Sequence, residues 1–364
     1  MARLLPILSC EYQYPPPKPA AKAATTITQV NKTRLPKGRP VPAGKLHFKS
    51  LHPLTSAAAL VTLLLAACTH SPGTVHLNGE APAFDGQRAY RYTATAAHFG
   101  PRPPGSAAHA RLLAWLESRL AGTDWTTQAF SADTPDGPLP MTNLIVRFPG
   151  TRPGVIVIGG HYDTLSHRPH FVGANDGGSS TGILLALADH YRTHPPQGPG
   201  VWIVWLDGEE AIRDWSGNDH TYGSRALARR WVGNGTAGRI RAVLILDMIG
   251  DRDLGVARDT DATPWLMDSV CREAQRIGAG PAFCRYDQEI EDDDTEFRAA
   301  GFPAADLIDF RYGPFNGYWH TPQDTLDKLS PHSFRIVGSV VLATVHALAA
   351  RDRHNGTKPT ASTP

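Results

Sequence analysis

The stretch VWIVWLDGEEAIRDWSGNDHTYGS, residues 201–224, determines how the rest of the chain is interpreted. Its first six residues are all apolar, which is typical of a strand buried on both faces of a sheet. Asp207, Gly208, Glu209 and Glu210 follow at the point where that strand has to end. Two adjacent glutamates at this position need a physical explanation, because burying an unpaired carboxylate costs several kcal/mol.

Strand-like apolar runs alternate with helix-like patterns through most of the chain. This alternation predicts an α/β fold with a central, mostly parallel mixed sheet flanked by helices, in a single catalytic domain at 87–352. In chain order, the strands are expected at 141–150, 154–163, 201–207, 242–250 and 303–310, and the helices after a cap at Ser106 and at 173–194, 264–278 and 332–350.

The N-terminal segment differs in composition. Residues 1–45 are rich in Pro, Lys, Ala and Thr without an apolar period, which predicts disorder or a segment upstream of the true translation start. Residues 46–68 combine a basic flank, an apolar run over 57–67 and small residues before Cys68, as in a secretory signal. The apolar run is too short to span a membrane, which takes ~20 residues. A linker is expected at 69–86 and a flexible tail at 353–364.

Leu65-Ala66-Ala67-Cys68 resembles a bacterial lipobox. We therefore expect an exported protein, a periplasmic or cell-envelope lipoprotein whose membrane contact is made only through a lipid on Cys68. An ordinary signal with a chance cysteine is the alternative. Of the four cysteines, only Cys271 and Cys284 lie in the mature fold, where they either pair or remain free thiols.

The charge balance disfavours one class of partner. The formal net charge is +2, from 36 basic and 34 acidic side chains, so no strong field points to nucleic acid.

Metal-ligating residue types gather at the expected strand ends. In an open α/β sheet, sites form at the carboxyl ends of the strands. Asp, Glu and neutral His are ligands that suit Zn²⁺ where thiolates are absent, and a cation would compensate buried acids. Past a strand end, one of two adjacent glutamates can bind the ion while the other moves protons. The residues at these ends are His161, Asp163, Asp176, Glu209, Glu210, Asp247 and His320.

Several motifs resemble a known superfamily. GGHYD, GANDGGSST, WLDGEEA, LDMIGD and YWHT are similar to motifs of the zinc-dependent aminopeptidases, and FGPRPPGSAAH resembles their N-terminal segment. Within that superfamily, FVGAND, DGEEAIRDWSGNDHTYGSR, IEDDDTEF and PFNGYWHT resemble the glutaminyl-peptide cyclotransferases. The resemblance covers about 95–350.

The resemblance implies an activity, a cofactor and roles for individual residues. The activity is conversion of the N-terminal glutamine of peptides or proteins to pyroglutamate, with release of ammonia. One zinc ion would be held by Asp176, Glu210 and His320, with Glu209 as the proton shuttle. Asp247 and Asp292 would be hydrogen-bonded acids that steady the substrate, and His161 and Asp163 would be second-site or supporting residues. The pocket walls would be Trp215, Ile290, Phe315 and Trp319.

The chain departs from the family pattern next to Asp292. Asp294 and Glu296 stand where relatives commonly have His and Pro, and Glu291 stands where Gln can occur. A more acidic rim would favour substrates with a basic second residue.

Two other functions remain open. A two-zinc exported aminopeptidase is the first, because His161 and Asp247, which bind the other metal in that branch, are both present. The second is a non-enzymatic binding lipoprotein, against which Glu209 argues, since a binding site needs no free base beside its metal.

Overall fold

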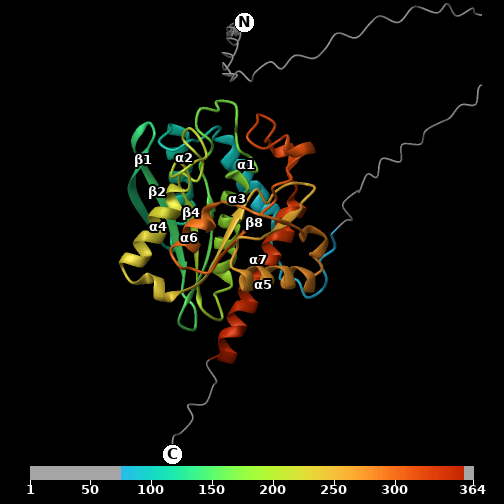
Figure 1. The fold of residues 1–364 in the computed structure, drawn as a ribbon. Helices are drawn as coiled ribbons and strands as arrows, with labels where there is room; N and C mark the ends of the chain where they lie inside the picture. The colour runs from blue at the N-terminus through green and yellow to red at the C-terminus, as the bar shows by residue number, and fades with distance from the viewer. Residues whose placement is uncertain (1–74, 356–364) are drawn as a thin grey trace, which may run out of the picture. The chain divides into compact units, whose positions relative to one another are not determined.

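The computed structural model describes residues 75–355, with side chains described through Arg351 (Figure 1). The expected leader at 1–45, the signal segment at 46–68 with Cys68, and residues 356–364 of the expected tail lie outside the described residues.

The helices and strands follow one another in an α/β order. The helices are α1 (Gly86–His98), α2 (Ala107–Arg119), α3 (Gly178–Thr193), α4 (Tyr222–Gly233), α5 (Pro264–Arg276), α6 (Asp293–Ala299) and α7 (Pro331–Asn355). The strands are β1 (Asp124–Thr134), β2 (Gly137–Phe148), β3 (Val155–His161), β4 (Gly200–Leu206), β5 (Ile240–Asp247), β6 (Val256–Asp259), β7 (Phe283–Gln288) and β8 (Ala304–Ile308). Short 3₁₀ turns lie at Thr236–Arg239, Gly280–Ala282, Pro314–Asn316 and Leu326–Lys328.

Within residues 75–355, the central sheet contains six strands in the order β1-β2-β4-β3-β5-β8. Strands β4, β3, β5 and β8 are parallel, whereas β2 is antiparallel to both of its neighbours. Strands β6 and β7 form a separate parallel pair. The predicted fold, a mostly parallel mixed sheet flanked by helices, is confirmed.

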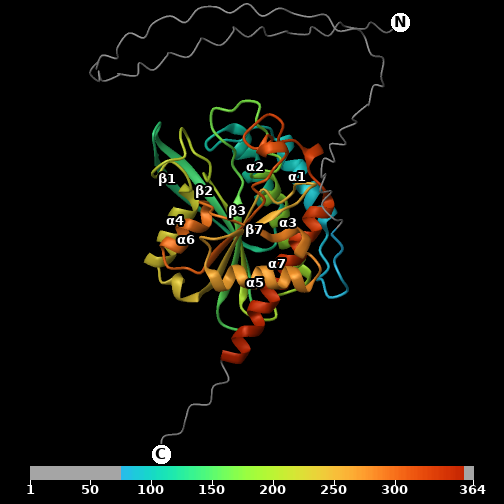
Figure 2. The same cartoon turned by 45° about the vertical axis from the view of Figure 1, so that its right-hand side comes forward.

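Burial on both faces explains the uninterrupted apolar runs. Every residue of β3 and β4 is buried. On β3, Ile156 and Ile158 pack into the core that includes α1, α3 and α7, whereas Val155 and Val157 pack into the core that includes α4 and α6. The sheet therefore lies between two helical layers (Figures 1 and 2). Helix α7 is long and apolar enough to cross a membrane, but most of it is buried in this core.

Two segments outside the sheet are also fixed. Residues from Val75 onward, within the expected linker, contact the domain: the backbone N–H of Asn78 donates to Ile277 O at 2.9 Å, and the His332 ring contacts Val75 O at 3.0 Å. Cys271 on α5 and Cys284 on β7 form a disulfide, which decides between the two alternatives left open by the sequence.

Candidate metal and catalytic site

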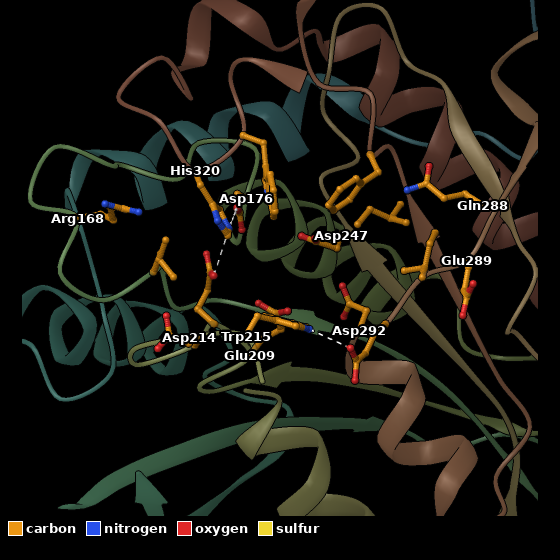
Figure 3. A pocket seen from close by; sticks show the side chains of 18 of the residues that line it. Arg168, Asp176, Glu209, Asp214, Trp215, Asp247, Gln288, Glu289, Asp292 and His320 are labelled. Atoms are coloured by element: carbon orange, nitrogen blue, oxygen red, sulfur yellow. Dashed lines mark hydrogen bonds and ion pairs between the residues drawn. The ribbon is translucent and has the colours of Figure 1, made fainter. Parts of the chain in front are cut away.

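A cavity of about 490 Å³ opens at the carboxyl ends of β4, β5 and β8. Its walls come from the loops that follow these strands and β3, as the strand-end argument predicted, and from the segment between β7 and α6. Figure 3 shows the side chains that point into it. The predicted site residues that line it are Asp176, Glu209, Glu210, Trp215, Asp247, Ile290, Asp292, Trp319 and His320.

Asp176, Glu210 and His320 converge on one point. The Nε2 atom of His320 lies 3.3 Å from Oδ2 of Asp176 and 3.3 Å from Oε2 of Glu210. Ligands at ~2.0–2.1 Å from a tetrahedral zinc are separated by roughly 3.3 Å, so this spacing fits a shared ion. Among the described residues, Oδ2 of Asp176 and both oxygens of Glu210 are buried without a hydrogen-bond partner. A divalent cation would satisfy all three atoms.

The charges of these three residues depend on one another. Burial and the charge of Asp176 raise the pKa of Glu210 to about 7, and the contact with His320 only partly offsets these two effects. Burial lowers the pKa of His320, but Asp176 and Glu210 outweigh burial and raise this pKa to about 10. Contacts with His161 and His320 hold the pKa of Asp176 below its usual value despite burial. The two carboxylates and the imidazole are therefore coupled electrostatically.

The glycine-rich turn before α3 positions Asp176. Asp324 accepts the backbone N–H groups of Asn175 at 2.8 Å and of Asp176 at 3.1 Å. Gly177 has a φ of +71°, and a Cβ atom there would lie 2.3 Å from the carbonyl oxygen of Asp163. Only glycine fits this turn, which brings Asp176 against the end of β3.

The adjacent glutamates point to different places. Asp163 accepts the backbone N–H groups of both, at 3.2 Å from Glu209 and 3.3 Å from Glu210. Glu210 points to the cation position, whereas Glu209 lines the cavity beside it, with its Oε2 atom 3.7 Å from Nδ1 of His161. Burial raises the pKa of Glu209 well above its ordinary value; His161 partly offsets this, and Asp292 adds to it. Asp163 is thus a positioning residue.

His161 belongs to a second group of possible ligands. Its Nε2 atom lies 3.0 Å from Oδ1 of Asp247 and 3.3 Å from Oδ1 of Asp176. Burial lowers the pKa of His161, but the carboxylates of Glu209 and Asp247 outweigh burial and raise it well above its ordinary value. His161, Asp176 and Asp247 are close enough to hold a cation, so two overlapping triads share Asp176.

Asp247 and Asp292 are both buried at the cavity but are not hydrogen-bonded to each other within the described chain. Asp247 accepts the backbone N–H of Met248 at 2.7 Å, and Asp292 caps α6 by accepting the N–H of Asp293. Burial, and then the charge of Asp247, raises the pKa of Asp292 well above its ordinary value. The two acids interact electrostatically. The prediction that they are hydrogen-bonded to each other is wrong for the described chain.

Aromatic side chains form two walls of the cavity. Trp319 stacks on His320, with ring centroids 4.0 Å apart, and packs against Phe310 at 4.8 Å. Trp215 stacks on His220 at 4.2 Å and is 38% exposed at the mouth. Ile290 is buried between the walls.

Phe315 does not wall the cavity, and that prediction is wrong. Its side chain is fully exposed and does not line the cavity. Residues 314–316 form a 3₁₀ turn in which Phe315 has a φ of +55°, and this left-handed conformation directs the ring to solvent. Phe310, two residues after the end of β8, lines the cavity instead.

Arg102 is a supporting residue to which the sequence analysis gave no role. It is completely buried and donates to the carbonyl oxygens of Tyr162 at 2.9 Å, Val172 at 2.6 Å and Gly173 at 2.8 Å. Burial lowers its pKa to about 10, while nearby acids including Asp324 oppose this effect. The only sequence signal was its place in FGPRPPGSAAH.

Comparisons with known proteins agree with this geometry. The model of Peptidase family M28 matches residues 143–345. A mouse (Mus musculus) glutaminyl-peptide cyclotransferase-like protein is 29% identical over 276 residues, which cover 66% of this chain and 71% of that protein. The crystal structure of an Acidobacteriales bacterium glutaminyl cyclase is 41% identical, with a TM-score of 0.73, covering 76% of this chain and 98% of that chain. A leucine aminopeptidase precursor from Bacteroides thetaiotaomicron is 26% identical, with a TM-score of 0.64, covering 74% and 99%.

Proposed function

The chain belongs to peptidase family M28, in its glutaminyl cyclase branch, and on that premise we propose that it is a zinc-dependent glutaminyl-peptide cyclotransferase. Its substrates would be peptides and proteins with an N-terminal glutamine, and its products pyroglutamyl chains and ammonia. The acyl group of the glutamine side chain moves from one nitrogen to another, so the enzyme is an acyltransferase.

One observation carries the proposal. The His320 nitrogen lies at the spacing of a tetrahedral ion from both carboxylates, all three ligand atoms lie within 4.8 Å of one another, and a further carboxylate, Glu209, lines the cavity beside them without joining the group. Bound zinc supplies Lewis-acid polarisation of a carbonyl group. Such a site needs a separate base near the reacting atoms, and Glu209 is placed for it.

The residues then have defined tasks. The α-amine of the glutamine attacks its own side-chain carbonyl carbon, and the new C–N bond closes a five-membered ring. Glu209 accepts the proton that the amine loses and delivers it to the departing amide nitrogen, which leaves as ammonia. Asp247 and Asp292 lie where they can orient the amine. Because both reacting groups belong to one residue, holding it folded draws on a proximity effect worth up to ~7–11 kcal/mol.

The test is an assay on a Gln-Ala peptide with zinc-loaded protein. Ammonia release should match pyroglutamate formation measured by mass spectrometry. The Glu209→Gln variant should keep its zinc but lose ~10²- to 10⁴-fold in kcat, the usual contribution of a general base. Turnover by the variant that equals wild type would remove Glu209 from the mechanism, whereas zinc-loaded wild type without turnover would favour a binding role for the site.

A two-zinc aminopeptidase is the second candidate. The His161, Asp176 and Asp247 triad favours it, because a second ion there would share Asp176 with the first. Zinc content per chain separates the two functions. About one ion with cyclisation supports the first candidate, and two ions with hydrolysis of a Leu-initiated peptide support the second.

We further propose that the protein is exported and anchored by lipid on Cys68. The Cys271–Cys284 disulfide supports this, because disulfides persist in oxidising compartments. A Cys68→Ser variant should move from the membrane fraction to the soluble envelope fraction. Equal membrane association of both forms would contradict the anchor.

A further inference from the structure

We propose that Glu289 and Glu291, at the mouth of the cavity, select substrates whose second residue is basic. This inference rests on the proposed function, and it names the class of peptide that the site prefers.

The segment between β7 and α6 carries both acids. Strand β7 ends at Gln288 and α6 begins at Asp293, and the intervening residues line the cavity. Ile290 is 6% exposed and faces inward, whereas Glu289 and Glu291 on either side of it are exposed. The two carboxylates therefore flank the entrance rather than the reacting centre.

Two contacts hold Glu291 in place. Its Oε2 atom accepts a hydrogen bond from Trp215 Nε1 at 3.2 Å, and its Oε1 atom lies 3.8 Å from Nε2 of His220. Burial lowers the pKa of His220, with Glu291 opposing this, so that ring is neutral near pH 7. Neither contact places a positive charge against Glu291.

Two arginines line the cavity, and among the described residues neither is paired with Glu289 or Glu291. Arg213 lines the cavity, but its Nε donates to Asp136, which is not part of the lining, at 2.6 Å. Figure 3 shows Arg168 at one end of the cavity and Glu289 at the other, with the cation ligands and Asp292 between them. Glu289 therefore lies at the end of the cavity next to Asp292, away from Arg168, and Asp214 is a further acid of the lining on the Arg168 side.

The chemistry places the second residue at the Glu289 end of the cavity. In the proposed reaction the side-chain carbonyl of the glutamine would face the cation held by Asp176, Glu210 and His320, and its amine would face Glu209 and Asp292. The rest of the peptide leaves from the same carbon as the amine and advances at most ~3.6 Å per residue. The second side chain therefore passes beside Glu291 and Glu289, where a Lys or Arg is attracted and a Glu is repelled.

The experiment compares kcat/KM for Gln-Lys, Gln-Ala and Gln-Glu peptides of otherwise identical sequence. Wild type should rank them in that order, with up to ~5-fold between neighbours, because these carboxylates are exposed and screened by solvent. The difference should lie mainly in KM and should shrink at high salt. In a Glu289→Gln/Glu291→Gln double variant the ratio of Gln-Lys to Gln-Glu should fall toward one. An Asp124→Asn variant, at the opposite end of the sheet, is the matched control and should keep the wild-type ratio.

The outcomes separate this inference from the function on which it rests. Normal turnover of Gln-Ala with equal rates for Gln-Lys and Gln-Glu overturns the selectivity and leaves the cyclotransferase intact. A preference that survives in the double variant overturns the assignment to these two acids. Failure to cyclise any of the three peptides overturns the proposed function itself.

Discussion

Asp163 binds the backbone of Glu209 through an N–H···O contact of 3.2 Å, and the same carboxylate holds the next residue through its other oxygen at 3.3 Å. A buried acid therefore uses both oxygens to fix the turn at which the ligand and the base diverge. Gly208, with a φ of +69°, allows the chain to turn there.

Replacing Asp163 by Asn should leave the fold intact but loosen this turn. An amide oxygen accepts fewer and weaker hydrogen bonds than a carboxylate. Loss of such a supporting partner typically costs ~10- to 100-fold in metal affinity or activity. Zinc competition and steady-state kinetics on a Gln-Ala peptide measure both. Asp133→Asn, at an exposed acid on β1, is the control. Wild-type zinc affinity and kinetics for Asp163→Asn would show that the turn keeps its conformation without the Asp163 carboxylate.

Arg102→Lys tests the support behind Asp176. Lysine keeps the positive charge but lacks the planar fork that reaches the Val172 and Gly173 carbonyls together. Loss of buried hydrogen bonds from a charged donor should lower the free energy of unfolding by roughly 2–4 kcal/mol. Urea unfolding with an unchanged m-value measures this. An unchanged midpoint would contradict the role, and Arg147→Lys on the sheet surface is the matched control.

Much of the site was predictable because strand ends and metal ligands leave local signals. Unbroken apolar runs indicated β3, β4, β5 and β8, and parallel strands bring their carboxyl ends to one edge. Asp176 and Glu210 are therefore neighbours although their strands are separated by a helix. Strand β1 was missed because its sequence, DWTTQAFSADT, is polar and largely exposed at the edge of the sheet.

Other features depend on conformation and could not be predicted from composition. The direction of Phe315 follows from its positive φ, which no residue type in PFNG specifies uniquely. The role of Arg102 requires knowing that three carbonyl groups from distant segments lie around it. The pairing of Cys271 with Cys284 likewise needed the packing of α5 beside β7.

The disulfide should stabilise the fold. It links positions 13 residues apart, and a loop of about that size contributes ~3 kcal/mol by restricting the unfolded chain. A Cys271→Ser/Cys284→Ser variant should therefore unfold at a lower urea concentration than oxidised wild type, and wild type treated with reductant should match the variant. Identical midpoints for all three forms would show that the disulfide adds no stability.

Asp306 on β8 should make stability depend on pH. Both of its oxygens are buried without a hydrogen-bond partner in the described part of the chain. Burial, and then the charges of Asp292, Asp294, Asp247 and Asp259, raises its pKa well above the ordinary value. The folded protein thus keeps a proton that the unfolded chain releases above ~pH 3.9.

The stabilisation from Asp306 is complete below that pH and is lost as the pH rises through the folded pKa. Asp306→Asn carries no such proton, so its stability relative to wild type should grow from about pH 4 to about pH 8. Urea midpoints across this range measure the difference. The four neighbouring acids that raise the pKa of Asp306 are present in both proteins, so the comparison reports on Asp306 itself. A difference independent of pH would mean that Asp306 is ionised in the folded state.

The central claim is that Asp176, Glu210 and His320 share one ion while Glu209 stays free of it. Anomalous diffraction at the zinc edge, from crystals of zinc-loaded protein, tests this directly. We expect one peak at ~2.0–2.2 Å from a side-chain atom of each of the three residues, with no Glu209 oxygen in contact. A peak ligated by Glu209, or no peak between these three residues, would contradict the account.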